Sequence, residues 1–166
     1  NGTWGILSRD EKTGTVYVPT DSGSPDLVGI WRPGDNKWAN STVALDAATG
    51  QMKWAFQNHR HDIYDYDTMA APVPVDITRN GQKSSVIVQT TKQGMLWILD
   101  ALTGKPVHPY EERPIPQSKI PGERTAATQL FTLAPPPLAQ MAIDREHLSE
   151  LSAKSRTARL APTDTP

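Results

Sequence analysis

A turn of the form Asp-x-x-Thr-Gly occurs three times in the chain, and this repetition constrains the fold more than any other feature. The copies begin at Asp10, Asp46 and Asp100. The Asp side chain can cap such a turn by accepting backbone N–H groups, and the Gly supplies a left-handed conformation. Each copy lies beside apolar, strand-like runs, which places it at the corner of a hairpin. Three such corners predict repeated antiparallel units of about the size of a propeller blade.

The runs that flank these turns predict an all-β, antiparallel core over about residues 3–104. The paired ranges are 4–8 with 15–19, 41–46 with 51–56, and 85–89 with 95–99. No helix is expected before about residue 138. The prolines in 70–74 are expected to end regular structure. Eight of the fifteen prolines lie between Pro106 and Pro137, so the later part is expected to be mostly extended or irregular.

Composition excludes several kinds of protein. The net charge of −1 gives no general attraction to nucleic acid, so no nucleic-acid partner is expected. The chain has no cysteine, which excludes disulfides and thiolate metal sites. It is 37% hydrophobic, without an apolar run of transmembrane length. It does not begin with Met, and we expect a processed product or an excised piece of a longer protein.

The range 59–67 carries the chemistry. Its sequence, HRHDIYDYD, has three carboxylates, two histidines and two tyrosines. No apolar face of a helix or strand needs that composition, so we expect a loop at the rim of a sheet. In an extended loop Asp65 and Asp67 would point the same way and could share one cation, while Asp62 would point to the other side. A solvated, charge-rich turn is the alternative interpretation.

Four ordered motifs resemble those of dehydrogenases that depend on pyrroloquinoline quinone (PQQ). ALDAATGQMKW at 44–54 is similar to the tryptophan-docking repeat of quinoprotein propellers, in which the Trp of each blade packs on the next. HDIYDYD at 61–67 resembles the active-site segment, and TKQGMLWILD at 91–100 the stretch that follows it. The range 111–129 resembles the membrane-bound glucose, quinate and shikimate branch. The resemblance covers about residues 2–131.

The resemblance implies a fragment of a larger fold. The family fold is an eight-bladed β-propeller of antiparallel four-stranded blades, of which this chain would supply about two. We therefore divide the chain into a partial propeller region at 1–131 and a Pro-rich linker with a possible short helix and tail at 132–166. Blades bury their faces against neighbours, so the isolated chain is expected to expose apolar surface, for instance at Trp54, and to be inactive by itself.

The same resemblance assigns roles to four residues. Asp65 aligns with the catalytic base and is also a candidate metal ligand, together with Asp67. Trp4 aligns with the indole under the quinone, and Lys92 with a cation that contacts the quinone oxygens. His61 is a weaker candidate, which could orient a substrate or Asp65. The alternatives are a turn-capping Asp, a core Trp, a solvated Lys and a surface His.

One further position departs from part of the family. Ser22 stands where alcohol-oxidising relatives often carry a metal-binding Asn, and the sugar branch also departs from Asn there. A hydroxyl is a weaker neutral calcium ligand than an amide oxygen. This difference fits the resemblance to the sugar branch.

The family thus implies oxidation of an alcohol or sugar hydroxyl, with hydride transfer to PQQ. The implied metal is a divalent cation, Ca²⁺ in the first place, with Mg²⁺ or a lanthanide as alternatives. The implied partners are a small-molecule substrate, the remaining blades and the membrane quinone pool. The parent would be periplasmic and anchored to the inner membrane. A non-catalytic propeller scaffold is the alternative function, and Asp65, Trp4 and Lys92 distinguish the two because a scaffold needs only the docking repeats.

Overall fold

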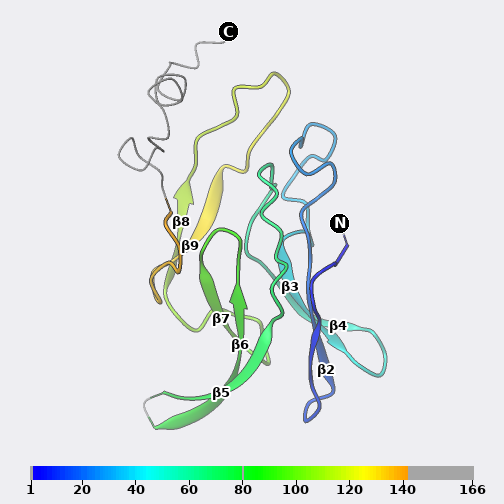
Figure 1. Ribbon diagram of the computed structural model, residues 1–166, viewed down its shortest axis with the longest axis vertical. Helices are drawn as coiled ribbons and strands as arrows, with labels where there is room; N and C mark the ends of the chain where they lie inside the picture. The colour runs from blue at the N-terminus through cyan, green and yellow to red at the C-terminus, as the bar shows by residue number, and fades with distance from the viewer. Residues whose placement is uncertain (1, 80, 142–166) are drawn as a thin grey trace, which may run out of the picture.

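The structure of the chain, a computed structural model, describes residues 2–79 and 81–141, which form three antiparallel sheets (Figure 1). The strands are β1 (Ser8–Asp10), β2 (Thr15–Pro19), β3 (Ser41–Asp46), β4 (Met52–Gln57), β5 (Val73–Arg79), β6 (Gln82–Thr90), β7 (Leu96–Asp100), β8 (Tyr110–Pro114) and β9 (Thr128–Thr132). No helix occurs in the described residues, which confirms the prediction of an all-β chain.

The first two sheets correspond to the two predicted blades. The first has four strands in the order β1-β2-β3-β4, and the second has three in the order β5-β6-β7. An isolated antiparallel bridge between Leu99 of β7 and Pro106 lies where the fourth strand of this blade would pair. The antiparallel, partial-propeller architecture is therefore as predicted.

The sequence-based prediction placed one strand wrongly and missed another. The first strand begins at Ser8 rather than at Trp4, because Thr3 donates its hydroxyl to Pro19 O (2.5 Å) and the Trp4 indole turns toward Asp67. The range 70–74 does not end regular structure, since β5 begins at Val73. Pro74 is tolerated there because β5 is the edge strand of its sheet, where one side of the backbone needs no partner.

The third sheet, the β8–β9 hairpin, was not predicted. Residues 110–114 pair in register with 128–132, although prolines dominate this part of the chain. Pro114 closes β8, and the remaining prolines lie outside the paired residues. The part of the chain after residue 104, expected to be mostly extended or irregular, thus contains a paired hairpin that was not predicted.

The three repeated turns have the predicted caps. Asp46 accepts hydrogen bonds from the backbone N–H groups of Ala48 (3.1 Å) and Thr49 (3.0 Å), and Asp100 accepts one from Thr103 (2.8 Å). Asp10 accepts the corresponding bond from Lys12 (3.0 Å). The Gly that ends each turn has a positive φ, between 59° and 71°. These caps fix the corners of the hairpins.

Trp54 joins the first two sheets. Its indole packs against Tyr17 with ring centroids 5.9 Å apart, and its Nε1 donates to Ala101 O (3.0 Å) in the turn after β7. The ring also covers Gly104, where no Cβ would fit. Trp54 is only 8% exposed. The expectation that it lacks a neighbouring blade was wrong, because the second blade lies within the same chain.

The core continues from this contact into the third sheet. Phe56 packs on Trp97 at a centroid distance of 4.8 Å, and Trp97 contacts the ring of Tyr110 on β8 at 5.9 Å. Leu130 of β9 belongs to the same buried cluster. One apolar core therefore connects all three sheets and holds the loops between them in fixed relative positions.

Replacing Trp54 with alanine should lower the free energy of unfolding of the parent protein by about 3–5 kcal/mol, the range for truncating a buried aromatic side chain. The change removes the packing between blades and the hydrogen bond to Ala101. Denaturant unfolding measures the loss. Leu102→Ala is the control, since Leu102 lies in the same turn and is 85% exposed. Equal stabilities of the two variants would contradict the docking role.

Residues 133–141 are irregular in the structure and contain no helix. The possible short helix within 138–160 and the tail lie almost entirely beyond Met141, outside the described residues. Within the described part of the chain, no helix is long and apolar enough to cross a membrane.

Candidate functional site

The loop 59–67 connects β4 to β5 and is not extended. His61 and Asp65 have positive φ angles of 44° and 59°, so the backbone leaves the extended conformation at both residues. Such left-handed conformations are uncommon for residues other than Gly, although Asp and His adopt them more often than most. The simple alternation expected for an extended loop is therefore wrong, and tertiary contacts decide where each side chain points.

Asp62 organises the loop. It is completely buried, and its carboxylate accepts hydrogen bonds from the backbone N–H groups of Tyr64 (2.8 Å) and Tyr66 (2.6 Å) and from the side chain of Asn40 (2.8 Å). The two backbone bonds bracket Asp65. Asp62 was expected to point away from Asp65. Its hydrogen bonds instead shape the backbone segment that carries Asp65.

Lys92 brings the two other acids together. Its ammonium group donates to Asp65 O (2.8 Å), to Asp65 Oδ2 (3.2 Å) and to Asp67 Oδ2 (3.1 Å). These three acceptors use all the N–H donors that a lysine has. The two carboxylates therefore converge on one cationic group, the Lys92 ammonium. The sequence predicted instead that an extended loop would let them share a metal cation, and that metal ligation stays a prediction.

Asp67 is held as a carboxylate. It is 6% exposed, and its Oδ1 accepts hydrogen bonds from the N–H (2.8 Å) and the hydroxyl (3.0 Å) of Ser22. Burial by itself would raise the pKa of Asp67, but the Ser22 N–H, Lys92 and the Ser22 hydroxyl together hold that pKa below its usual range. Burial likewise would lower the pKa of Lys92, and its bonds to Asp67 and Asp65 raise it instead. Both groups stay charged at neutral pH.

Trp4 completes the cluster. Its indole Nε1 donates to Asp67 Oδ2 over 3.3 Å, which fixes the edge of the ring beside the carboxylates. The side chain is nevertheless 59% exposed. An anchored indole with an open face can serve as a platform for a planar aromatic ligand. The structure thus brings Trp4, Asp65, Asp67 and Lys92 into one cluster.

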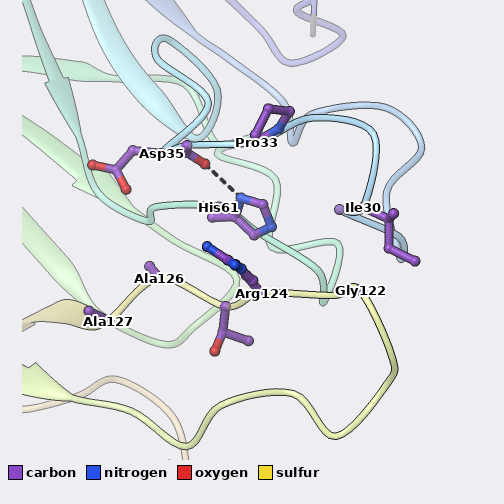
Figure 2. A pocket seen from close by; sticks show the side chains of 11 residues that line it. Ile30, Pro33, Asp35, His61, Gly122, Arg124, Ala126 and Ala127 are labelled. Atoms are coloured by element: carbon purple, nitrogen blue, oxygen red, sulfur yellow. Dashed lines mark hydrogen bonds between the residues drawn. The ribbon is translucent and has the colours of Figure 1, made fainter.

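His61 does not join this cluster. Its Nδ1 lies 2.6 Å from Gly34 O and its Nε2 lies 3.4 Å from Glu123 Oε1. The ring is buried and lines a separate cavity of about 380 Å³, which Figure 2 shows with Arg124 beside it. Burial would raise the pKa of Glu123, but hydrogen bonds from the N–H groups of Gly29 and Arg124 and from His61 lower it. A role of His61 in substrate orientation stays a prediction.

Several residues that shape the site were not predicted. Asn40 and Glu123 meet the loop from positions 22 and 62 residues away, and Gln129 meets it from β9. Only the Pro121-Gly122-Glu123 segment carried a signal, as part of the family resemblance. Contacts at such separations have no periodic pattern in the sequence, so spacing could not have revealed them.

The cluster offers two carboxylates to a cation and an indole and an ammonium group to a planar cofactor, but it does not form a complete metal site. Two carboxylates already share one positive group, and a metal ion bound by Asp65 and Asp67 would use the same oxygens as Lys92. In the described part of the chain, no three His, Asp or Glu side chains gather closely enough to hold a metal alone. Asp65 and Asp67 alone do not complete the coordination of such an ion, which also takes carbonyl, amide and water oxygens. Trp4 and Lys92 would contact a cofactor.

His59 makes the stability of the fold depend on pH. It is 4% exposed, and burial lowers its pKa to about 4, against a smaller opposite effect of Asp62. In the unfolded chain His59 takes up a proton near pH 6.5. The unfolded state therefore binds more protons between pH 6.5 and 4, and stability should fall as the pH falls through this window.

Replacing His59 with glutamine should flatten this dependence, because the side chain then has no proton to gain. Denaturant unfolding of the parent protein at several pH values between 4 and 7.5 measures it. His108→Gln is the matched control, because it makes the same substitution at a partly exposed histidine outside this loop. Equal slopes for wild type and His59→Gln would contradict the assignment.

Known proteins are similar to this chain in sequence and in fold. A family model described as a glucose/ethanol/alcohol dehydrogenase β-propeller domain with PQQ matches residues 1–163. The chain is 38% identical over 131 residues to a quinoprotein glucose dehydrogenase from Escherichia coli and 37% identical over 129 residues to a quinate/shikimate dehydrogenase (quinone) from Acinetobacter baylyi. These alignments cover 78% and 76% of this chain but 16% of each relative, so the chain spans about a sixth of their length.

A solved structure supports the same relationship. The quinohemoprotein alcohol dehydrogenase from Comamonas testosteroni superimposes with a TM-score of 0.61 at 28% identity, over 80% of this chain and 20% of the other. A europium-containing methanol dehydrogenase gives a TM-score of 0.60 at 27% identity, over 75% and 22% of the two chains.

Proposed function

Since the chain belongs to the family of glucose/ethanol/alcohol dehydrogenase β-propeller domains, we propose that it supplies active-site residues to a PQQ-dependent dehydrogenase that oxidises an alcohol or sugar hydroxyl. The observation that carries this proposal is the convergence of Asp65 and Asp67 on Lys92. The Trp4 indole donates a hydrogen bond to the carboxylate of Asp67. A propeller scaffold needs the docking contacts of Trp54 but has no use for this cluster.

Each residue has a role that follows from its environment. Asp65, partly exposed in a loop shaped by the Asp62 hydrogen bonds, takes the proton of the substrate hydroxyl as a general base. Lys92 keeps a positive charge beside the place where negative charge develops. Asp67 holds both Lys92 and Trp4 in position. When bound, PQQ supplies the two-electron oxidant, with the indole of Trp4 as its platform.

The metal and the substrate branch follow from the same residues. Asp65 and Asp67 would contribute to binding Ca²⁺, with Mg²⁺ or a lanthanide ion as alternatives. The Ser22 hydroxyl donates to Asp67. Unlike an asparagine at this position, Ser22 has no side-chain amide oxygen that could bind a metal ion. This arrangement supports the glucose, quinate and shikimate branch over the alcohol branch. A periplasmic parent that is anchored to the inner membrane and passes electrons to the quinone pool is in keeping with that branch.

The test uses the full-length parent protein, because the remaining blades are needed to close the site. The protein is loaded with PQQ and with Ca²⁺, Mg²⁺ or a lanthanide ion, and dye reduction is followed with glucose, quinate and shikimate. Turnover that requires both PQQ and a metal ion is expected. A parent that binds neither, or that oxidises no alcohol or sugar, would instead be a scaffold.

A further inference from the structure

The β8–β9 hairpin holds the beginning of the loop that carries Asp65. The side chain of Gln129 on β9 accepts the N–H of Arg60 (2.9 Å) and donates to Arg60 O (2.6 Å), so it pairs with that backbone as a neighbouring strand would. The guanidinium group of Arg60 contacts Glu112 on β8 and Thr128 on β9.

The next residue along the loop is held from the same hairpin. Glu123, in the connection between β8 and β9, contacts His61 Nε2, and its other carboxylate oxygen accepts the N–H of Gly29 (2.6 Å). Gly29 has no room for a Cβ because His61 and Glu123 lie against it. Two consecutive loop residues, Arg60 and His61, are therefore fixed by one hairpin.

This attachment matters because the backbone turns at this place. His61 has a φ of 44°, a conformation that persists only where surrounding contacts enforce it. Immediately afterwards, Asp62 binds the N–H groups of Tyr64 and Tyr66 on both sides of Asp65. A change in the backbone conformation at residues 60–61 would therefore move the carboxylate of Asp65.

Gln129 is the centre of the attachment. It is 3% exposed, and it lines a cavity of about 330 Å³ together with His59, Tyr66 and Lys92. Packing alone would be served by an apolar side chain of the same length. A buried amide that satisfies both the donor and the acceptor of one backbone residue instead fixes the position of that residue.

We propose that the β8–β9 hairpin clamps the catalytic loop and that Gln129 is a positioning residue for Asp65. This inference rests on the proposed function of Asp65. Gln129 touches no reacting atom, and it acts by holding Arg60 so that the turn at His61 and the Asp62 bonds deliver the carboxylate to Lys92.

The test compares Gln129→Met with the matched control Gln117→Met in the full-length enzyme. Gln117 lies in the same hairpin, is exposed and bonds only within the hairpin. Gln129→Met should lower kcat about 10- to 100-fold with a KM changed by less than about threefold, because a base displaced by about 1 Å costs roughly that much. In the Asp65→Asn background, the same change should cost less than about twofold, since a misplaced base is already lost.

Hydrogen exchange of the cofactor-free protein gives a readout that is independent of activity. Gln129→Met should expose the backbone N–H groups of residues 60–66 to exchange, while strands β3 and β6 and the Gln117→Met control keep their protection. Gln129→Glu keeps an acceptor for Arg60 N–H and places an oxygen against Arg60 O, so it serves as a second variant if Gln129→Met does not fold. It too should release residues 60–66.

Wild-type kcat in Gln129→Met, an equally large loss in the Asp65→Asn background, or unchanged exchange at residues 60–66 in either variant would overturn the clamp. If the wild-type parent shows no PQQ-dependent turnover, the proposed function fails. The exchange experiment then still decides whether the hairpin holds the loop.

Discussion

Asp65→Asn should lower the turnover of the full-length enzyme by about 10²–10⁴-fold, the usual contribution of a positioned general base. The amide keeps the size of the side chain but cannot take up a proton from the substrate. The loop should survive the change, because its shape depends on Asp62 and Asp65 is only partly buried. Dye-linked oxidation of glucose, quinate and shikimate at saturating PQQ and Ca²⁺ measures the loss.

The control for this variant is Asp26→Asn, which changes an exposed carboxylate in another loop and should have no effect. Asp62→Asn, which an extended loop would have made a mild change, is now expected to be damaging. An asparagine offers one side-chain oxygen where the buried carboxylate serves three donors. Melting experiments should show lowered stability for Asp62→Asn and an unchanged one for Asp65→Asn. Near-normal turnover in Asp65→Asn would disprove the assignment of the base.

Lys92→Met should lower kcat by about 10²–10³-fold, as the removal of one charge-stabilising donor does in other active sites. The change also leaves Asp65 and Asp67 without their shared counter-charge, so the two carboxylates should repel each other. Loss of Lys92 removes a cause that lowers the pKa of Asp67, and this pKa should rise. Steady-state kinetics with the dye-linked assay measures the effect on kcat.

Lys92→Arg separates charge from hydrogen-bond geometry. It keeps the positive charge but spreads it over a planar group, so partial recovery of kcat relative to Lys92→Met is expected. Lys119→Met, at an exposed position, is the matched control and should retain wild-type kinetics. Full activity in Lys92→Met would show that the cation takes no part in the reaction.

The strands near the repeated turns were predictable because their signals are local. Asp46 and Thr49 bond within one turn. Strands β2 and β7, which lie next to two of these turns, alternate in burial as half-buried strands do. The β8–β9 hairpin was missed because its prolines suggested irregular structure, whereas only Pro114 lies within the pairing. Pro74 was misjudged for a related reason. Whether a strand is an edge strand depends on the whole sheet, which no local pattern reports.

The sequence by itself determined the repeat and the family, and it named Trp4, Asp65, Asp67 and Lys92 as candidate site residues. Their side-chain chemistry and their order along the chain are written in the motifs. The tertiary structure decided how the loop presents them, through the buried Asp62, the left-handed turns at His61 and Asp65, and the attachment of Arg60 to Gln129. These contacts join residues up to 69 positions apart. Their geometry follows from how the sheets pack on one core, and that packing exists only in the folded chain.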